Sequence, residues 1–305
     1  MAGVFFIFFT RIKTKSNLFA YLTGVLLLAV CTACGTKPAP TPNSRPFTDE
    51  LGRTVYIVQS PARIISLAPS VTETLFALGM GDRVVGVTTY CDYPPEAKAK
   101  ASIGDTQKPN LEKIVALKPD LIIASTSSQL ESFVRNIEDA KIPLYISNPR
   151  NIEETVTSIQ AIGDVVGASE KAQELTGKLR ARIEQVHLRT ATREKPKVFV
   201  MLGAEPLITV GGKTFINDLI TQAGGLSISA DQSSDYPQYS FETVIARRPE
   251  IIFLQAGDDK LPERLKQTPA ALNGRLYHMN DDLLLRPGPR IVDGLEQIAE
   301  KIHPQ

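Results

Sequence analysis

Two glutamates stand at the same position of a segment that occurs twice in this chain. Residues 110–125 and 240–255 align without a gap, and the alignment matches Glu112 with Glu242. Each copy reads as a polar N-cap, a short amphipathic helix, a Pro-acid stop and a buried apolar strand. A carboxylate in the first turn of a helix is stabilised by the helix dipole. The repeat therefore predicts two similar lobes, each carrying one such carboxylate, with a binding site between them.

Other motifs that could do chemistry are weak. Residues 211–214 read Gly-Gly-Lys-Thr, but Leu207 stands where a phosphate-binding Walker A loop needs its first glycine. A glycine turn entering a helix is sufficient to explain this motif. Ser70 follows an expected strand without an evident histidine partner, and the positions of the histidines indicate no metal cluster: His187, His278 and His303. We expect no catalytic residue, no metal site and no cofactor, so an exported enzyme is the weaker interpretation.

The bulk composition limits the class of protein without naming a ligand. The chain has 305 residues, of which 43% are hydrophobic and 22% charged, and its formal net charge is +1. This length suits two domains with ordinary cores. Interspersed charges of both signs give no basic surface for nucleic acid. We expect a monomeric, globular two-lobed protein that does not bind nucleic acid.

The N-terminus reads as a secretory signal. An apolar run at 18–30 follows three basic residues and ends in Cys31-Thr-Ala-Cys34. A cysteine after a small residue resembles a bacterial lipobox, in which the cysteine is lipidated and becomes the mature N-terminus. Cys34 follows alanine and is favoured, whereas Cys31 follows valine. The sequence thus predicts a lipoprotein signal peptide over 1–33, with an uncleaved membrane anchor as the alternative.

A Pro-rich polar segment follows and is expected to form an extended tether over 34–46. Together, signal, lipid and tether predict a folded protein held outside the cytoplasmic membrane through a lipid anchor. If Cys34 is acylated, Cys91 is the remaining cysteine of the folded part. No intrachain disulfide can then form, so the fold must depend on its hydrophobic cores.

Strands alternate with helices through the rest of the chain. The first half predicts strands at 54–58, 63–67, 84–87 and 144–146, and the second half begins with a strand at 197–202. Expected helices start at Ser70, where Ser70 and Glu73 fit a capping box, and cover 130–140, 214–224 and 290–302. This alternation is typical of parallel sheets covered on both faces, an α/β fold.

Helical periodicity is continuous from 152 to 189, with a break at Gly167 and a new N-cap at Ser169. The second piece, of roughly 20 residues, would span about 30 Å. That length suits a strut between lobes, although an ordinary amphipathic helix packed on one lobe fits the same pattern.

Three runs of the chain together resemble a known family. Residues 63–73, 86–95 (Gly-Val-Thr-Thr-Tyr-Cys-Asp-Tyr-Pro-Pro) and 110–124 are similar to cobalamin-binding proteins of ABC importers, within the iron-siderophore/cobalamin class of substrate-binding proteins. The resemblance covers essentially everything after the tether. It implies two Rossmann-like lobes, 47–150 and 193–305, bridged by one long helix within 151–192. The ligand would lie in the cleft, and hinge motion would be small.

The resemblance also implies roles for the matched glutamates. In this family paired glutamates, one per lobe, dock onto arginine pockets of the dimeric membrane permease, and they correspond to Glu112 and Glu242. A first-turn carboxylate that projects outward can meet a bidentate guanidinium. The alternative is that both glutamates serve only their helix termini.

Ligand contacts implied by the resemblance come from both halves of the chain. Tyr236 stands where the best-known member of the family has a tryptophan. Thr106 and Ser125 stand where that member has two further tryptophans. The candidate ligand-binding residues are Tyr90, Thr106, Ser125, Tyr236, Asp282 and Arg286. The implied ligand is cobalamin or another corrinoid. A ferric siderophore or haem is the alternative cargo, and a tyrosine such as Tyr90 could then bind iron.

Overall fold

The computed structural model describes residues 43–106, 108–125, 131–255 and 260–304. The chain divides into Met1–Pro42 and Asn43–Gln305, and the account below concerns the second unit. The expected signal peptide, Cys31, Cys34 and most of the expected tether lie outside the described residues. Among the described residues, no helix is long and apolar enough to cross a membrane.

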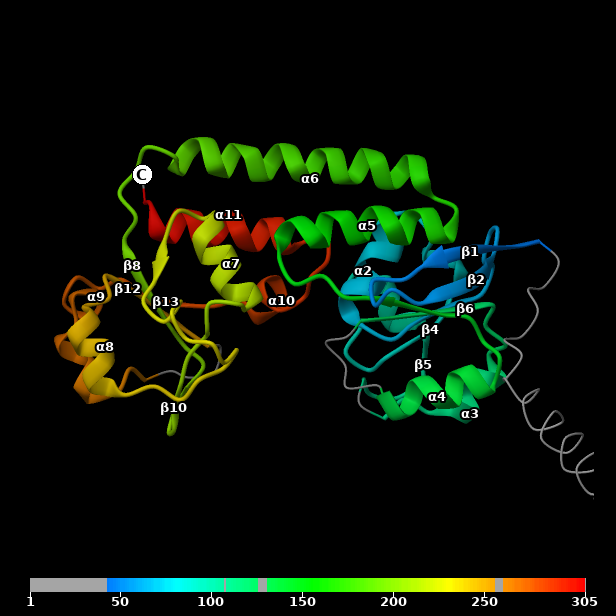
Figure 1. The fold of residues 1–305 in the computed structure, drawn as a ribbon, viewed down its shortest axis with the longest axis horizontal. Helices are drawn as coiled ribbons and strands as arrows, with labels where there is room; N and C mark the ends of the chain where they lie inside the picture. Colours follow the sequence, from blue (N-terminus) through cyan, green and yellow to red (C-terminus); the bar gives the residue numbers. More distant parts are fainter. Residues whose placement is uncertain (1–42, 107, 126–130, 256–259, 305) are drawn as a thin grey trace, which may run out of the picture. The chain divides into compact units, whose positions relative to one another are not determined.

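The N-terminal lobe is built on a five-stranded parallel sheet in the order β5-β4-β3-β6-β7 (Figure 1). Its strands are β3 (Ile64–Ser66), β4 (Val84–Val87), β5 (Ala101–Ser102), β6 (Leu121–Ser125) and β7 (Leu144–Ser147). Its helices are α2 (Pro69–Ala77), α3 (Leu111–Ala116) and α4 (Glu131–Asp139), with short 3-10 turns η1 (Gly81–Arg83) and η2 (Pro95–Ala99). Adjacent residues Ile64 and Ile65 belong to different core clusters, because neighbouring side chains of a strand point to opposite faces. The sheet is therefore buried on both faces, as the apolar runs predicted.

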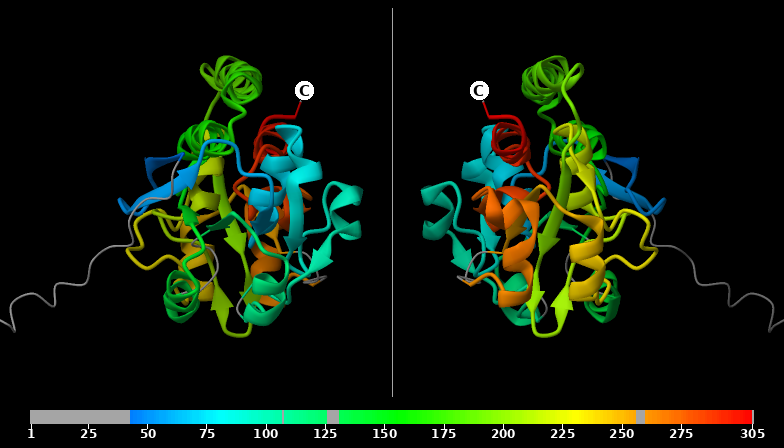
Figure 2. Two further views of the ribbon diagram at one scale, coloured as in Figure 1. Left: turned by 90° about the vertical axis from the view of Figure 1, so that its right-hand side faces the viewer. Right: turned by 90° about the vertical axis from the view of Figure 1, so that its left-hand side faces the viewer.

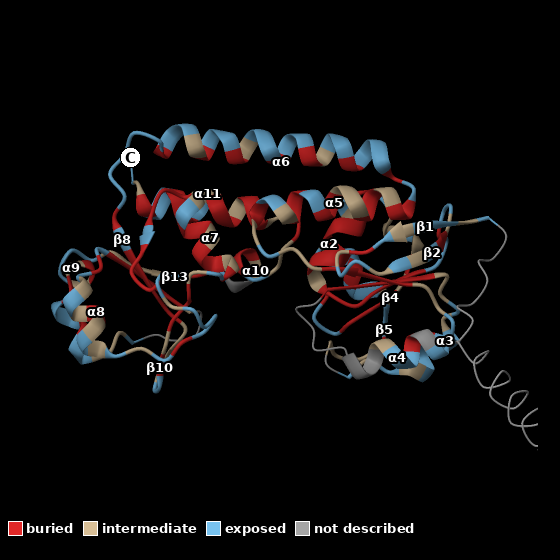
Figure 3. Ribbon diagram, viewed as in Figure 1, coloured by how far each residue is buried: buried red, intermediate tan, exposed pale blue. Residues whose placement is uncertain are grey.

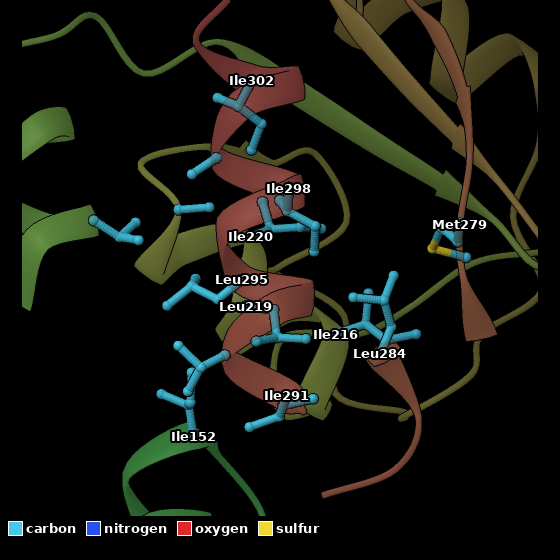
Figure 4. Close-up of a cluster of buried hydrophobic side chains, with 14 of the residues drawn as sticks. Ile152, Ile216, Leu219, Ile220, Met279, Leu284, Ile291, Leu295, Ile298 and Ile302 are labelled. Carbon is cyan, nitrogen blue, oxygen red and sulfur yellow. The ribbon is translucent and has the colours of Figure 1, made fainter. Parts of the chain in front are cut away.

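The C-terminal lobe repeats this plan with a separate four-stranded parallel sheet in the order β11-β8-β12-β13. Its strands are β8 (Lys197–Met201), β11 (Leu226–Ser227), β12 (Ile251–Leu254) and β13 (Leu276–His278), with a small hairpin of β9 (Gly203–Ala204) and β10 (Leu207–Ile208). Its helices are α7 (Phe215–Gln222), α8 (Phe241–Arg247), α9 (Pro269–Leu272), α10 (Asp281–Leu284) and α11 (Ile291–Ile302), with the turn η3 (Glu263–Gln267). Apolar residues of α7 and α11 form the centre of this core (Figure 4). The prediction of two α/β lobes is confirmed.

The internal repeat is preserved in the local geometry of both lobes. Asn110 caps α3 by accepting the N–H of Lys113 at 3.0 Å, and Ser240 caps α8 by accepting the N–H of Thr243 at 3.0 Å. Both helices end near a basic residue with positive φ, Lys118 at 46° and its repeat partner Arg248 at 52°.

The acid of each Pro-acid stop binds the backbone at the start of the first strand in the parallel sheet of its lobe, β3 or β8. Asp120 accepts the N–H groups of Ala62 and Arg63 at 2.8 and 3.0 Å, and Glu250 accepts the N–H of Lys197 at 3.1 Å. A backbone N–H at the start of a strand needs a partner, so the repeated acid has a structural role in both lobes.

Helices α5 (Ile152–Val166) and α6 (Ser169–Thr190) connect the lobes. Gly167, at φ 75°, ends α5 in a left-handed conformation, and α6 then runs back along it (Figures 1 and 2). Ala172 of α6 packs in the N-terminal core, while Ile183 and Val186 pack in the C-terminal core. The expected long bridging helix is therefore present, and it keeps an exposed outer face along its length (Figure 3). Its N-cap is Ala168, without a side-chain hydrogen bond, rather than the expected Ser169.

The expected boundary of the tether at residue 46 is wrong. Strand β1 (Ser44–Thr48) pairs antiparallel with β2 (Thr54–Val58), so the fold begins before the predicted lobe boundary at 47. Phe47 and Val55 pack against the N-terminal core, and that burial stabilises the hairpin despite the proline in β1.

The expected capping box at the start of α2 is also wrong. Pro69 occupies the first turn, Ala68 is the N-cap, and no side chain caps the helix. The Glu73 carboxylate instead meets a residue of the other lobe: it accepts hydrogen bonds from Arg290 Nε at 3.0 Å and Arg290 Nη2 at 2.6 Å. The Glu73 side chain is only 2% exposed, which makes this bidentate pair a buried contact between lobes.

Glu73→Gln tests the energetic weight of that contact. Removing one partner leaves a largely buried guanidinium uncompensated, so we expect the free energy of unfolding in urea to fall by about 3 kcal/mol. Combining Glu73→Gln with Arg290→Met should recover part of the loss, since neither charge then remains buried alone. Glu174→Gln, in an exposed pair with Lys178, is the control and should leave the urea midpoint unchanged. Equal midpoints for Glu73→Gln and the control would contradict this assignment.

The raised pKa of the Glu50 carboxyl group should make the stability of the fold depend on pH. One of its carboxylate oxygens accepts the N–H of Asn148, and burial raises the pKa of Glu50 above 4.5 although the hydrogen bonds with Ser158 and Asn148 oppose the rise. A raised folded-state pKa gives stability that is present below the unfolded pKa and is lost as pH rises through the folded pKa. Glu50→Gln should therefore gain stability relative to the wild type between pH 4 and 8 in urea unfolding. Parallel stability curves for the two proteins would contradict the prediction.

Candidate functional site

A pocket of about 180 Å³ is lined by residues of both lobes. The N-terminal lobe contributes Ala68, Pro69 and Ser70 after β3, Tyr90 after β4, and Thr106 after β5. The C-terminal lobe contributes the segment after α10: Leu285, Arg286 and Pro287. Because the strands are parallel, the carboxyl ends of β3, β4 and β5 meet at one edge of the sheet.

The strand order favours a ligand site at this edge of the sheet. From β3 the chain builds β4 and β5 on one side and then returns to build β6 and β7 on the other. Such a reversal leaves a crevice outside the carboxyl ends of the strands, which is the usual ligand site of open α/β sheets. A larger depression of about 470 Å³ lies elsewhere on the C-terminal lobe, among exposed residues such as Arg193 and Lys195 before β8. We place the candidate site at the interlobe pocket, where the topology provides a crevice.

Arg286 is the charged centre of the pocket. Its Nη1 donates to Asp92 Oδ1 at 2.6 Å and lies 3.6 Å from Glu73 Oε1, while its Nη2 lies 2.7 Å from Asp282 Oδ1. The hydrogen bond from Arg286 holds the pKa of Asp92 below its usual value. One arginine thus joins carboxylates of both lobes at the edge of the pocket.

A glycine lets the two lobes approach closely beside this arginine. A Cβ atom at Gly288 would lie 3.1 Å from the backbone oxygen of Ser70 and 3.3 Å from its Cα. Two residues further on, the Arg290 guanidinium lies over the ring of Tyr93 at 3.9 Å from its centroid. The segment 286–290 therefore packs its backbone and both arginines against the N-terminal lobe.

The walls near the opening are partly apolar. Tyr90 is 57% exposed, Tyr93 43% and Leu285 45%. Large side chains that remain this exposed beside a pocket are typical of a surface that a ligand covers. Cys91, next to Tyr90 in the sequence, is buried in the core of the N-terminal lobe, and burial raises the pKa of its thiol.

The structure brings four of the six expected ligand residues together. Tyr90, Thr106 and Arg286 line the pocket, and Asp282 pairs with Arg286. The other two lie outside the lining: Ser125 is buried at the end of β6, and Tyr236 is 59% exposed in the loop before α8.

Sequence reasoning missed the polar network that joins the lobes: Glu73, Asp92, Tyr93 and Arg290. Asp92 and Tyr93 lie within the motif at 86–95, but nothing in their spacing indicates a contact with residues almost 200 positions later. Glu73 did carry a signal, because a carboxylate on the apolar face of a short helix needs a partner when it is buried.

No group of three or more His, Cys, Asp or Glu in the described part of the chain could hold a metal ion. Ser70 contributes to the lining of the pocket and to the close approach of Gly288.

Both matched glutamates are exposed in the first turns of their helices, Glu112 in α3 and Glu242 in α8. Glu242 makes a loose ion pair with Arg264 at 3.4 Å, with side chains 75% and 68% exposed. Neither helix lies beside the long bridging helix α6 (Figure 1). The two carboxylates are thus available on the surface, one per lobe.

Comparison with known proteins places this geometry in a family. The model of the periplasmic binding protein family matches residues 64–283. An uncharacterized ABC transporter substrate-binding lipoprotein of Bacillus subtilis is 33% identical over 96% of this chain and 98% of its own length.

Solved structures agree with this placement. The crystal structure of the periplasmic vitamin B12 binding protein of Vibrio cholerae is similar at 31% identity and a TM-score of 0.72, covering 79% of this chain and 96% of that one. A periplasmic heme-binding protein from Roseiflexus sp. RS-1 is similar at 28% identity and a TM-score of 0.71, covering 79% and 97%. With two parallel-sheet lobes, a bridging helix and a pocket between the lobes, the chain belongs to the periplasmic binding protein family, whose members are substrate-binding proteins of ABC transporters.

Proposed function

We propose that this protein is an extracytoplasmic lipoprotein that captures cobalamin or another corrinoid and delivers it to an ABC importer. The observation that carries the proposal is the pocket between the lobes, where Tyr90 and Thr106 face Leu285 and Arg286. The similarity to a vitamin B12 binding protein over 79% of this chain supports the ligand class. Anchoring would be through Cys34, outside the described residues.

The exposed apolar walls suit a flat, largely neutral ligand. A corrin ring presents a broad apolar face and a rim of amide side chains, so it needs apolar surface together with a few hydrogen-bonding groups. Tyr90 and Leu285 supply apolar surface, and Asp282 with Arg286 supplies polar groups. A pocket of about 180 Å³ would receive one edge of such a ligand, with the rest lying against the exposed tyrosines.

A second candidate is a haem or ferric-siderophore cargo. It is favoured by Tyr90, a phenol 57% exposed at the pocket, because tyrosine can bind haem iron. The similarity to a heme-binding protein at 28% identity supports it. Against it stand the acidic partners of Arg286, which leave little free positive charge for propionates or for an anionic siderophore.

A melting-temperature screen against cyanocobalamin, cobinamide, haemin and several ferric siderophores separates these candidates. A ligand at 100 times its Kd stabilises the folded state by about 2.7 kcal/mol, which should raise Tm by several degrees. We expect the rise with both corrinoids, and heat of binding in titration calorimetry. A rise with haemin alone, lost in Tyr90→Phe, would favour the second candidate. No response to any corrinoid would contradict the proposal.

Delivery requires a contact with the permease, and we propose that Glu112 and Glu242 make it. Both side chains are exposed on the two copies of one helix–strand unit, so each lobe offers an equivalent anchor. A two-fold symmetric permease would be matched by such a pseudo-symmetric pair.

Glu112→Lys combined with Glu242→Lys should weaken binding to the cognate permease by at least about tenfold, since each reversal replaces an attractive charge pair by a repulsive one. Corrinoid affinity should stay within about twofold, because neither residue lines the pocket. The matched control is Glu170→Lys combined with Glu300→Lys, two exposed glutamates on α6 and α11. Unchanged transport and permease binding in the first variant would contradict the docking role.

A further inference from the structure

Arg286 belongs to the lining of the pocket, and the two aspartates paired with it lie outside that lining. The Arg286 side chain is 16% exposed, whereas its partners Asp92 and Asp282 are 45% and 49% exposed. A ligand that reaches Arg286 therefore meets a guanidinium whose charge is already balanced by carboxylates.

Both terminal nitrogens of the Arg286 guanidinium already have carboxylate partners. Nη1 is taken by Asp92 at 2.6 Å and Nη2 by Asp282 at 2.7 Å. An arginine recognises a carboxylate best through two parallel N–H donors. A ligand carboxylate would have to displace at least one aspartate from Arg286 to be bound in that way.

The formal charges of the network also disfavour the binding of a ligand carboxylate. Three carboxylates, those of Glu73, Asp92 and Asp282, surround the guanidinium groups of Arg286 and Arg290, so the network carries one net negative charge. The ring of Tyr93 lies over Arg290 and covers it. Lys98 also acts on Asp92, but it is exposed on η2, where solvent screens it.

We propose that Asp92 is a specificity-determining residue: together with Asp282 it occupies Arg286, so that the pocket accepts neutral, amide-bearing groups and discriminates against carboxylates. This inference rests on the proposed function and narrows its ligand class. A carboxylate accepts more than one hydrogen bond, so the partly exposed oxygens of Asp92 and Asp282 beside Arg286 suit the N–H groups of primary amides.

A purely structural role for Asp92 would have a different signature. Asp92 lies in the N-terminal lobe and Arg286 in the C-terminal lobe, so their bond also joins the lobes. Weakening that contact would lower the affinity for every ligand of the pocket by a similar factor. Charge selection instead changes the ratio of affinities for two ligands that differ only in charge.

The test compares matched ligands on wild-type protein and on Asp92→Asn. The first pair is cyanocobalamin and its monocarboxylic acids, in which one peripheral propionamide is hydrolysed to a carboxylate. The second pair is haemin dimethyl ester and haemin. In the wild type we expect the member without a free carboxylate to bind about tenfold tighter than at least one acid of its pair. In Asp92→Asn the ratio should fall to about twofold or less, because Arg286 is then partly released.

Asp231→Asn is the matched control, because Asp231 forms a pair with Arg247 at 2.7 Å, against 2.6 Å for Asp92 and Arg286, and lies outside the lining of the pocket. It should keep the wild-type ratio, and thermal unfolding should confirm that both variants are folded. Binding without a preference for the member that lacks a free carboxylate, or an unchanged ratio in Asp92→Asn, would overturn the inference while leaving the proposed function intact. Binding of neither ligand pair would overturn the proposed function and this inference together.

Discussion

The pair between Glu73 and Arg290 is the contact on which the site depends. A carboxylate with a side chain 2% exposed lies inside the N-terminal lobe, and its charge is balanced by an arginine at the start of α11 in the other lobe. A buried charge without a partner is strongly unfavourable, so this pair disfavours separation of the lobes at this point. The same segment, 286–290, brings Arg286 to the pocket and places Gly288 against Ser70. The relation between the two walls of the pocket is thus set by electrostatics and close packing in the segment 286–290.

The bridging helices α5 and α6 form a second set of contacts that holds the lobes together. Both α5 and α6 contribute side chains to the cores of the two lobes, and Arg182 of α6 pairs with Asp293 and Glu296 of α11. A helix that is packed at both ends resists bending, because bending would disturb close-packed side chains in two cores. The bridging helices and the Glu73–Arg290 pair thus form two separate sets of contacts between the lobes.

The repeated unit gives the two halves a common set of structural devices. In each copy a polar residue caps the helix, a basic residue with positive φ follows it, and an acid binds the backbone at the start of the first strand of the parallel sheet. These interactions are local or between neighbouring strands, so the same residues can perform them in both lobes. The exposed glutamate of each copy takes part in none of them, which leaves it available for a partner outside the chain.

Local rules were enough for the alternation of the main strands and helices and for the helix caps of the repeat, but not for strand β1 or the start of α2. Apolar runs, glycines and capping residues act over a few positions, so Gly167 and Asn110 could be assigned from the sequence alone. The resemblance to a family added Tyr90, Thr106 and Arg286 as candidates, and the structure places them around one pocket.

The tertiary structure alone decided the partners of the buried charges. Glu73 fits a capping box by spacing, yet its carboxylate pairs with a residue 217 positions away. Arg286 is a positive charge in the sequence, but two aspartates from different lobes make its surroundings negative. Pairing of distant charges depends on how whole lobes pack, and no local pattern records it.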